Sequence, residues 1–511
     1  MSKGLLKSTA VVSIMTLVSR VSGLVRDVVM ANILGSGGVA DAFFVAFRIP
    51  NFLRRIFGEG AFSQAFIPVF SELTESNTLE AKRFVNATAG MLALITLVLS
   101  ILGVIFAPFL VSLYAYGYVE KPDQFNATVD ALRVMFPYLF CVSLVAMSAG
   151  ILNTQNRFAI PAVTPVLLNV CMILAMWLLV PLMDNAAKAL AIGVMIAGGV
   201  QLLFQIPSLK KEGYLPNFKV DTKNEHTHKV FRLMLPAVFS VSVAQVNMFV
   251  NTVLASFLVT GSVSWLYYSD RLMEFPVGVF GIALATVVLP SLSKEHASGS
   301  PEHFSKMLDW ALRWVLVISV PATFALYVLA LPLLTTIFQY NAFTINDVYM
   351  SGLALQAFAV GVCGFIFVKV LAPGFFARQD TKTPMKVAVF SVIVNVVLSI
   401  VLVRYFQHVG LALSVSIAAW ANALLLFAIL LIQNVYRPEP GWIMFLVKIC
   451  AAVSAMVFVL VYLDVDENAW FAWSLIERVS HLGIMVTLGA AAYFVVLYVL
   501  GVRPKQLLLK R

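Results

Sequence analysis

The sequence predicts an all-α polytopic membrane protein, and its composition, its apolar segments and an internal repeat each support that fold class. Of the 511 residues, 61% are hydrophobic and only 12% are charged. Soluble proteins contain roughly 45 to 50% apolar and about 25% charged residues. A mean hydropathy of +0.92 is therefore typical of a chain that is largely surrounded by lipid.

Apolar segments recur along the whole chain and are separated by short polar connections. A spanning helix needs about 20 apolar residues, so the chain has room for about fourteen transmembrane helices. We expect the spans near residues 8–33, 39–70, 86–113, 128–152, 159–181, 187–207, 230–258, 262–292, 309–338, 350–373, 384–403, 409–433, 441–463 and 476–500. The second and eighth segments are longer than a perpendicular span, which predicts tilt or kinks, with Pro50 and Pro276 as the kink sites.

An internal repeat relates the two halves of the chain. "AFSQAFIPVFSE" at 61–72 resembles "ALATVVLPSLSKE" at 283–295, and "GILNTQNRFAIP" at 150–161 resembles "GFFARQDTKTP" at 374–384. Because an even number of helices separates the matched stretches, the two halves should have the same orientation in the membrane. Such twinned bundles enclose a central cavity and work by alternating access.

The repeat predicts two pseudo-symmetric six-helix lobes followed by two extra C-terminal helices. We place the N-terminal lobe at residues 1–215, the C-terminal lobe at 216–436 and the extra helices at 437–511. Basic residues concentrate at both chain ends and in the loops that follow even-numbered helices. By the positive-inside rule, both termini are expected in the cytoplasm.

Several classes of function are disfavoured by what the sequence lacks. The net charge of +10 is spread over short loops, which argues against nucleic-acid binding. The longest polar stretch, residues 208–232, is too short for a folded catalytic domain. The four cysteines are isolated in apolar runs and no enzyme motif is present, so we expect neither a metal nor a cofactor.

Charged side chains inside the apolar segments form the candidate site. On a helix, Asp41, Arg48 and Arg55 are spaced seven apart and share one stripe. Asn51 follows Arg48 by three residues and falls on the same stripe. The first and eighth segments add Arg20, Arg26, Asp270, Arg271 and Glu274. A charge at membrane depth costs at least about 2.5 kcal/mol, so these side chains should face a water-filled or protein-lined interior.

The excess of arginine over carboxylates predicts an anionic ligand. Arginine binds phosphate oxygens through two parallel hydrogen bonds and keeps its charge when it is partly desolvated. A diphosphate fits this chemistry, with the carboxylates holding the guanidinium groups in place. The alternative is that these charges are ion pairs that join helices, with some arginines reaching the membrane interface.

The chain resembles the MurJ (MviN) family of bacterial lipid II flippases along essentially its whole length. The resemblance is carried by "SRVSGLVRD", "DAFFVAFRIPNFLRRIFGEGAFSQAFIP", "ILNTQNRF", "GSVSWLYYSDRLMEFPVGVFGIALATVVLPSLS" and "KVLAPGFFARQDTKTP". That family belongs to the multidrug/oligosaccharidyl-lipid/polysaccharide (MOP) exporter superfamily, whose fold is two six-helix lobes. The resemblance implies that the two extra helices border a groove for a lipid tail.

The resemblance also implies a substrate and a site. The protein would move lipid II, the undecaprenyl-diphosphate-linked disaccharide pentapeptide, from the inner to the outer leaflet of the cytoplasmic (inner) membrane for peptidoglycan synthesis. By similarity, the residues that line the substrate cavity are Arg20, Arg26, Asp41, Arg48, Arg55, Arg271 and Glu274. We expect Asp41 to pair with an arginine in the empty protein and to compete with the phosphate. Implied partners are lipid II, membrane lipid and other cell-wall synthesis proteins.

Two other classes of function stay open. The first is a flippase or exporter of another anionic glycolipid or of a drug, although a site for cationic drugs should contain an excess of carboxylates. The second is a membrane glycosyltransferase or diphosphatase, which needs a catalytic carboxylate or histidine set on a loop that faces the substrate. The arginine-rich stripe favours transport of a lipid-linked anion over both.

Overall fold

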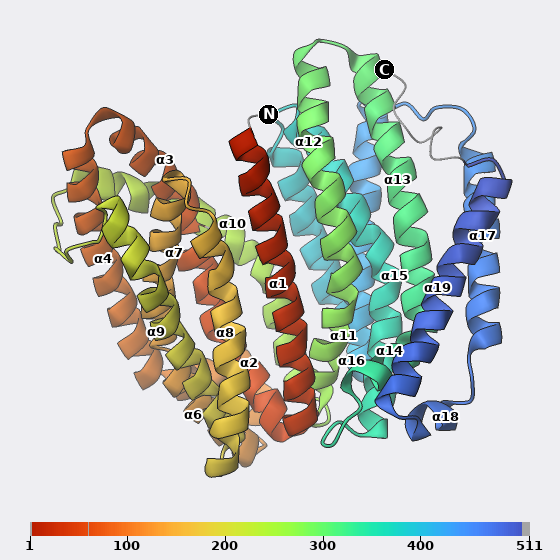
Figure 1. The fold of residues 1–511 in the computed structure, drawn as a ribbon, viewed down its shortest axis with the longest axis horizontal. Coiled ribbons are helices and arrows are strands. Elements are labelled where there is room, and N and C mark those ends of the chain that lie inside the picture. The colour runs from red at the N-terminus through yellow and green to blue at the C-terminus, as the bar shows by residue number, and fades with distance from the viewer. Residues whose placement is uncertain (1–2, 60, 503–511) are drawn as a thin grey trace. The chain divides into compact units, whose positions relative to one another are not determined.

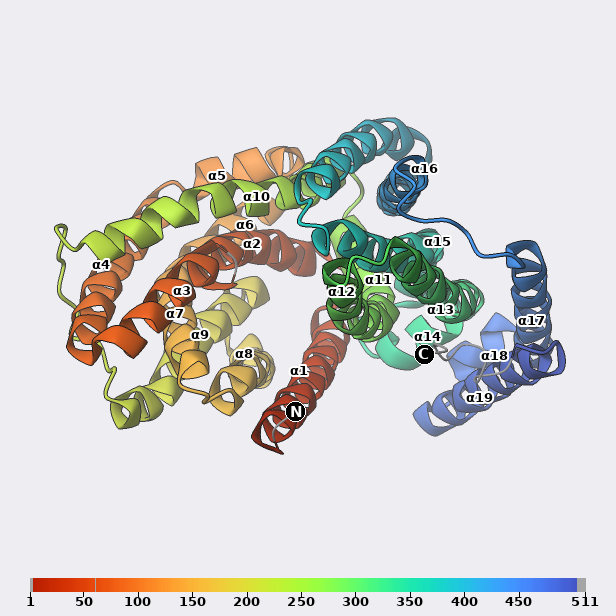
Figure 2. The same ribbon diagram turned by 90° about the horizontal axis from the view of Figure 1, so that it is seen from above.

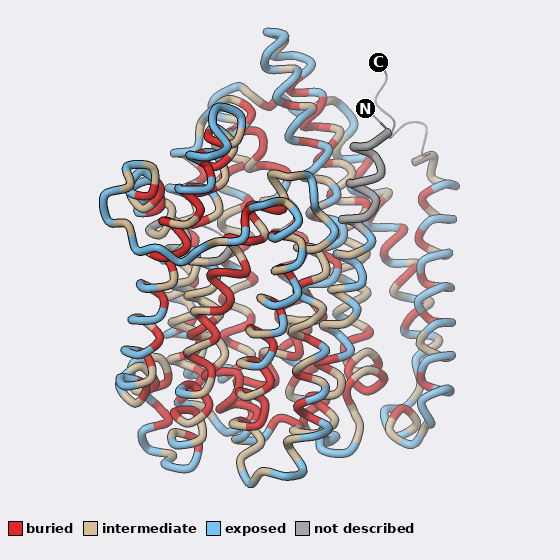
Figure 3. Tube along the Cα trace, turned by 60° about the vertical axis from the view of Figure 1, so that its left-hand side comes forward, coloured by how far each residue is buried: buried red, intermediate tan, exposed pale blue. Residues whose placement is uncertain are grey.

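The structure is a computed structural model that describes residues 3–59 and 61–502, and these are mostly helical and contain no strand. This confirms the all-α fold class. The chain divides into two compact units, Met1–Ser264 and Trp265–Arg511. Within each unit, buried and exposed residues alternate along the long helices, so that one face of a helix is packed and the other is open (Figure 3).

The element order shows the predicted repeat (Figure 1). The first series contains α1 (Lys3–Leu34), α2 (Gly38–Arg54), η1 (Arg55–Glu59), α3 (Ala61–Ser76), α4 (Thr78–Ile105), α5 (Ala107–Tyr114), η2 (Tyr116–Tyr118), α6 (Pro122–Met135), α7 (Tyr138–Thr154), α8 (Ala159–Leu178), η3 (Val180–Leu182) and α9 (Ala186–Glu212). The second series contains α10 (Glu225–Ser256), α11 (Ser262–Pro276), η4 (Val277–Gly281), α12 (Ile282–Ala297), α13 (Pro301–Val328), α14 (Ala330–Phe338), α15 (Ile345–Phe376) and α16 (Lys382–Ile432). Corresponding helices of the second series begin 221 to 224 residues after those of the first.

The number of membrane spans follows from helix length and composition. Among the described residues, nine helices are long and apolar enough to cross a membrane, and the bent pair of α6 and α7 makes a tenth. In this count α16 is one helix of 51 residues, although its backbone breaks at Gln407, where φ is 50°. The predicted spans at 384–403 and 409–433 lie on either side of that break. The expected total of about fourteen spans stays a prediction.

Both long predicted segments contain a helix interruption at the same place in the repeat. The five-residue π-helix η1 separates α2 from α3, and the five-residue π-helix η4 separates α11 from α12. The interruption begins five residues after Pro50 in the first series and directly after Pro276 in the second. Wide turns of this kind are common at helix kinks and at functional sites. They lie directly after the charged segments of α2 and α11.

One hydrophobic cluster of the first unit is built around aromatic side chains of α3 and α4. Phe62, Phe66 and Phe70 follow one another at four-residue spacing on α3, and their rings stack with centroids 5.3 and 5.6 Å apart. Phe84 of α4 stacks on Phe66 at 5.3 Å. Val230 of α10 is buried in the same cluster, and α10 runs beside α3 (Figure 2). The aromatic packing therefore fixes α10 against the helices that follow α2.

The second unit ends in α17 (Trp442–Leu463), α18 (Glu467–Ala472) and α19 (Leu475–Val499). Figure 1 shows α17 and α19 side by side, and both contribute to a hydrophobic cluster that includes residues of α13. Tyr493 of α19 donates a hydrogen bond from its hydroxyl to the carbonyl of Val317, at 2.8 Å. Part of the α13 face is therefore covered by the two C-terminal helices.

The linker after each series is held at an equivalent point. The side-chain oxygen of Asn86 on α4 accepts a hydrogen bond from the backbone N–H of Asn217, at 2.8 Å. A carboxylate oxygen of Asp309 on α13 accepts one from the N–H of Glu439, at 3.1 Å. The predicted lobe boundaries at 215/216 and 436/437 lie close to these anchors and stay predictions, since the first compact unit extends through α10 to Ser264.

Candidate functional site

The charged stripe that runs from α2 into the first residue of η1 lies along α10. Arg48 Nη1 donates to the hydroxyl of Thr252, at 2.6 Å, and Arg55 Nη1 donates to Gln245 Oε1, at 3.2 Å. The two arginines are seven residues apart, and so are their partners, which run in the opposite order along α10. Spacing of seven residues keeps side chains on one helix face. One face of α2 therefore meets one face of α10 through neutral polar partners.

The partners of these two arginines leave their positive charge uncompensated. Among the described side chains, no carboxylate lies within ion-pair distance of Arg48 or Arg55. Arg48 is half-buried and Arg55 is exposed. A guanidinium that is oriented by neutral hydrogen-bond acceptors keeps its full charge and its remaining donors for an anion. The stripe can therefore bind phosphate oxygens.

Asp41 does not pair with an arginine as expected, and caps the first turn of α11 instead. One carboxylate oxygen accepts from the N–H of Gly261, at 2.7 Å. The other accepts from the N–H and the hydroxyl of Ser264, at 2.9 and 2.6 Å. The side chain is buried, with 2% exposure. The physical reason is that a helix N-terminus presents unpaired N–H groups and a partial positive charge, which attract a buried carboxylate.

A positive charge, that of Lys121, caps the C-terminal end of α10. Lys121 donates from Nζ to the carbonyls of Leu258 and Ser256, at 2.6 and 3.4 Å. The N–H of Gly117 donates to the Ser256 hydroxyl, at 3.0 Å. A cation suits the carbonyl end of a helix, as an anion suits the amide end. The turn between α10 and α11 is therefore fixed by Lys121 on one side and Asp41 on the other.

Arg26 and Arg20 of α1 differ in their burial and in their partners. Arg26 is buried, donates to Asp27 Oδ1 at 2.6 and 3.0 Å, and reaches Asn169 Oδ1 on α8 at 3.1 Å. Asn169 in turn donates to the Ser22 hydroxyl, at 2.8 Å. Arg26 thus joins α1 to α8, as the alternative interpretation of these charges expects. Arg20 is half-buried, and no described side chain forms an ion pair with it.

Arg271 of α11 contacts two side chains of its own helix. The Arg271 guanidinium lies 5.2 Å from the ring centre of Tyr267, one turn earlier. Its Nη1 is 3.3 Å from Glu274 Oε2, and both groups are partly exposed. Asp270 is half-buried beside them. The Tyr267 ring and the Glu274 carboxylate orient the guanidinium while its exposed side stays accessible.

Sequence reasoning missed the partners that hold these charges. Thr252, Gln245, Ser264 and Asn169 were not predicted as site residues. The only signal for them was the presence of polar side chains inside apolar segments, with Gln245 and Thr252 at a spacing of seven. Predicted Asn51 accepts a hydrogen bond from Arg54 Nε, at 3.0 Å.

Metal binding has no support in the described part of the chain. No group of three His, Cys, Asp or Glu side chains there could hold an ion. The chemistry that the described side chains support is anion binding through guanidinium groups.

The chain matches known proteins over nearly its full length. The family model described as "Lipid II flippase MurJ" matches residues 30–496. A relative in Vibrio cholerae serotype O1, "Probable lipid II flippase MurJ", is 42% identical over 99% of this chain and 98% of its own length.

Solved structures give the same result. "Lipid II flippase MurJ, inward closed conformation" superposes with a TM-score of 0.81 at 27% identity, covering 95% of this chain and 97% of that one. An inward-facing multidrug resistance MATE family transporter of the MOP superfamily superposes with a TM-score of 0.67 over 82% of this chain and 95% of that one. Its identity of 14% shows a shared fold alone. The chain therefore belongs to the MurJ family of lipid II flippases, within the fold of the MOP superfamily.

Proposed function

We propose that this protein is a lipid II flippase that moves the undecaprenyl-diphosphate-linked disaccharide pentapeptide from the inner to the outer leaflet by alternating access. The observation that carries the proposal is membership of the MurJ family across residues 30–496. A flippase changes the sidedness of its substrate without making or breaking a covalent bond. The protein is therefore a transporter in peptidoglycan synthesis and not an enzyme.

Arg48 of α2 and Arg55 of η1 are the proposed contacts for the diphosphate. Arg48 and Arg55 are oriented by Thr252 and Gln245, which are neutral, so their charge is available to an anion. Arg271 of α11, held by Tyr267 and Glu274, is likewise proposed as a contact for an anion. Arginine suits this task because its planar fork fits two phosphate oxygens at once. The sugar and peptide groups are proposed to contact neighbouring polar side chains.

The remaining predicted site residues have different proposed roles. Arg20 is proposed as a further contact for the anion. Asp270 is proposed to influence Arg271 through its charge. Arg26 and Asn51 are proposed to contribute through the side chains to which they are bound, Asp27 and Arg54.

Asp41 is proposed to control separation of α2 from α11. In this conformation its carboxylate accepts three hydrogen bonds from the first turn of α11 and the residue that precedes it. A conformation in which these elements separate must break all three bonds. Two states that differ in such a buried contact interconvert only when another interaction, such as substrate binding, offsets its loss.

The protein is a multi-pass membrane protein, and we propose the cytoplasmic (inner) membrane as its location. Basic residues at the chain ends and in alternate loops support cytoplasmic placement of both termini. We propose that α17 and α19 border the path of the lipid tail. Other cell-wall synthesis proteins are proposed as partners because the flipped precursor is consumed on the outer side of the membrane.

The proposal is tested by depleting the protein in cells and probing the precursor with a reagent that reaches only the outer leaflet. We expect the lipid-linked precursor to accumulate and to become inaccessible from outside. Arg48→Ala should reproduce the defect at normal protein abundance. The matched control is Arg157→Ala, because Arg157 forms an exposed ion pair with Glu212 at 2.8 Å, and such pairs contribute about 0 to 1 kcal/mol.

Other outcomes distinguish the alternative functions. Accumulation of a precursor that stays accessible from outside would contradict the flippase proposal and favour export of another lipid-linked anion. A membrane glycosyltransferase or diphosphatase would convert lipid II into a product when the purified protein is incubated with it in detergent. A flippase leaves lipid II chemically unchanged in that assay.

A further inference from the structure

Lys369 is a charge within the apolar helix α15 that the proposed function does not use. It lies seven residues before the end of the helix at Phe376, which is about 10 Å by the rise of an α-helix. Its side chain is exposed, and among the residues that the structure describes none forms a hydrogen bond or an ion pair with its amine. An ionisable side chain in a membrane span is costly and usually has a functional partner.

The face of α15 that carries Lys369 is closed in the first half of the helix and open in the second. Residues seven apart share a helix face. The three residues at this spacing before Lys369 are each 0% exposed, namely Val348, Leu355 and Val362. Ser351, five turns before Lys369, accepts a hydrogen bond on its carbonyl from the Ser269 hydroxyl of α11, at 2.6 Å. The helix α11 therefore packs on the closed half, whereas Lys369 and Phe376 are exposed.

The open half begins where the neighbouring helix is interrupted. Pro276 ends α11, and the π-helix η4 follows it and ends at Gly281. The stem of Lys369 packs on this last residue, since a Cβ on Gly281 would lie 3.4 Å from Lys369 Cγ. A proline and a wide turn change the direction of a helix. The interruption therefore contacts the stem of Lys369 and leaves the rest of the side chain exposed.

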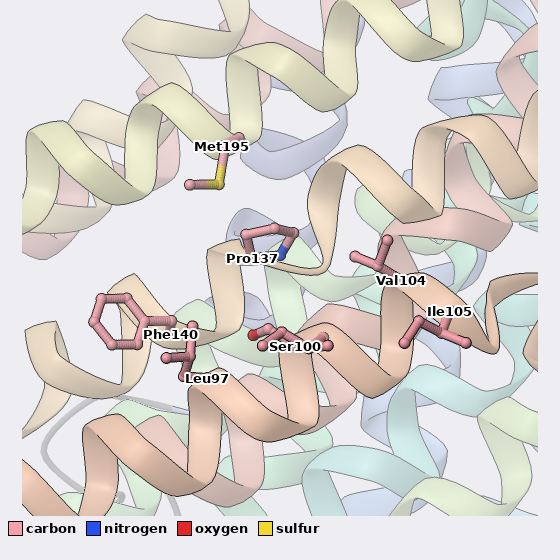
Figure 4. Close-up of a pocket in the computed structure, with 8 residues that line it drawn as sticks. Leu97, Ser100, Val104, Ile105, Pro137, Phe140 and Met195 are labelled. Atoms are coloured by element: carbon pink, nitrogen blue, oxygen red, sulfur yellow. The ribbon is translucent and has the colours of Figure 1, made fainter.

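The Lys369 face differs from a surface that meets lipid, which is apolar and stays exposed along the span. On α15 such a stripe contains Leu353 and Val360, which are 49% and 40% exposed. On the first unit, an open apolar surface is formed where side chains of α4 lie opposite Met195 of α9 (Figure 4). No charged side chain lines it, and the hydroxyl of Ser100 there donates to a backbone carbonyl of its own helix, at 2.7 Å. A face that is closed over half its length and then carries a charge is suited to a polar ligand.

The chemistry of Lys369 suits a carboxylate better than a diphosphate. A lysine amine is a compact charge with three donors, whereas the planar fork of arginine fits two phosphate oxygens. Gly281, on which Lys369 packs, follows Arg271 by ten residues, or about 15 Å along the helices. A diphosphate is much shorter than that distance. A ligand that contacts both cations must therefore carry a second anionic group away from its phosphates.

We propose that Lys369 binds the C-terminal carboxylate of the pentapeptide of lipid II. The inference rests on the proposed function, which supplies the substrate. Every linear pentapeptide ends in a carboxylate, and in lipid II the disaccharide separates the peptide from the diphosphate. Because no described residue pairs with Lys369 in the empty protein, a carboxylate can bind it without breaking an ion pair. Lys369 thus recognises the peptide, whereas the arginines recognise the diphosphate.

The proposal is tested with two forms of lipid II, one with the free C-terminal carboxylate and one in which this group is a carboxamide. Native mass spectrometry of the purified full-length protein in detergent measures the dissociation constant of each form. We expect the wild-type protein to bind the carboxylate form about fivefold more tightly, which is the upper end for a partly exposed charge pair. Lys369→Met should bind both forms equally, and Lys369→Arg, which keeps the charge, should keep the preference.

Two results would overturn the assignment. One is equal binding of both forms by the wild-type protein, and the other is an unchanged preference in Lys369→Met. The matched control is Lys386→Met, which removes an exposed lysine near the start of α16 and should keep the preference. The wild-type comparison decides the question even where Lys369→Met does not fold.

Failure of the inference is distinguishable from failure of the proposed function. Arg48→Ala should weaken binding of both forms equally, because the diphosphate is the same in both. A wild-type protein that binds neither form would contradict the proposed function, and the inference with it. A wild-type protein that binds both forms equally would contradict the role of Lys369 alone.

Discussion

The two repeats hold their charged side chains in different ways. Asp41 and Arg48 of α2 and Arg55 of η1 each reach a partner on another element. On α11, Arg271 is held by Tyr267 and Glu274, which lie one turn away on the same helix. The first repeat therefore holds Asp41, Arg48 and Arg55 through tertiary contacts, whereas Arg271 of the second repeat has two partners on its own helix.

The linker anchors show a related difference. Asn86 and Asp309 occupy equivalent positions, but the amide accepts one close backbone hydrogen bond whereas the carboxylate has four partners. Asp309 accepts from Tyr436, Trp442, Glu439 and Arg313, at 2.6 to 3.1 Å. Burial, together with the Asp309 carboxylate, raises the pKa of the Tyr436 hydroxyl well above its usual value, so that it stays a donor. The equivalent position is thus a single linker contact in the first repeat and a small buried network in the second.

Equivalent positions in the two repeats therefore need not contribute equally to the free energy of unfolding. A residue with several tertiary partners should affect both stability and transport, because its loss leaves buried groups unpaired. A residue in an exposed ion pair should affect transport more than stability, because such a pair contributes little to the free energy of unfolding. Substitutions at Asp309, Asp41 and Arg271 separate these cases.

The largest expected effect on stability is that of Asp309→Ala. It removes the acceptor of four hydrogen bonds from a site that is 4% exposed. Breaking a buried ion pair costs about 3 to 5 kcal/mol, and we expect the lower end because the Arg313 side chain is 24% exposed. Thermal unfolding in detergent measures the loss.

The equivalent change in the first repeat is the matched comparison. Asn86→Ala should lower the free energy of unfolding by only about 1 kcal/mol, since it removes one hydrogen bond at a half-buried position. Equal effects of the two substitutions would contradict the difference between the anchors. Glu302→Gln, which weakens an exposed pair with Lys306, should change stability little.

The next effect is that of Asp41→Asn, which keeps the side-chain shape and removes its charge. One of the two oxygens becomes an NH₂ group that cannot accept from the first turn of α11. We expect a loss of about 1 to 3 kcal/mol of stability, because buried N–H groups are left unpaired at a helix N-terminus. Thermal unfolding and cell growth on the variant as sole copy measure stability and transport.

The control for Asp41 is an acidic residue in the first turn of another helix. Asp123→Asn changes an exposed side chain at the start of α6 and should leave both measurements unchanged. If Asp41→Asn unfolds at the wild-type temperature and supports normal growth, the carboxylate has no role in joining α2 to α11.

The smallest effect on stability is expected for Arg271→Ala, although transport should be lost. Its ion pair with Glu274 is exposed, at 38% and 56%, and such pairs contribute about 0 to 1 kcal/mol. Precursor sidedness and thermal unfolding of the same preparation separate the two readouts. Lys306→Ala, at another exposed pair of this unit, is the control for transport. Destabilisation comparable to that of Asp309→Ala would show that Arg271 has tertiary partners that matter.

The sequence by itself determined the class of the protein and the faces of its helices. Apolar segments of spanning length and the offset of about 222 residues predicted an all-α, twice-repeated bundle, which the helix bounds confirm. The seven-residue spacing of Asp41, Arg48 and Arg55 placed them on one stripe, and Arg48 and Arg55 both meet α10. These features are local, because helical periodicity fixes which side chains share a face whatever surrounds them.

Only the tertiary structure decided which partner each charge takes. The sequence suggested an arginine as the partner of Asp41, yet the first turn of α11 binds it, and Arg26 joins α1 to α8. The 42° bend between α6 and α7 was likewise not predicted, since it depends on how the two helices pack. The physical reason is that a hydrogen bond requires atoms within about 3 Å. Which atoms approach that closely depends on how the helices pack, whereas helix periodicity is set along a single segment.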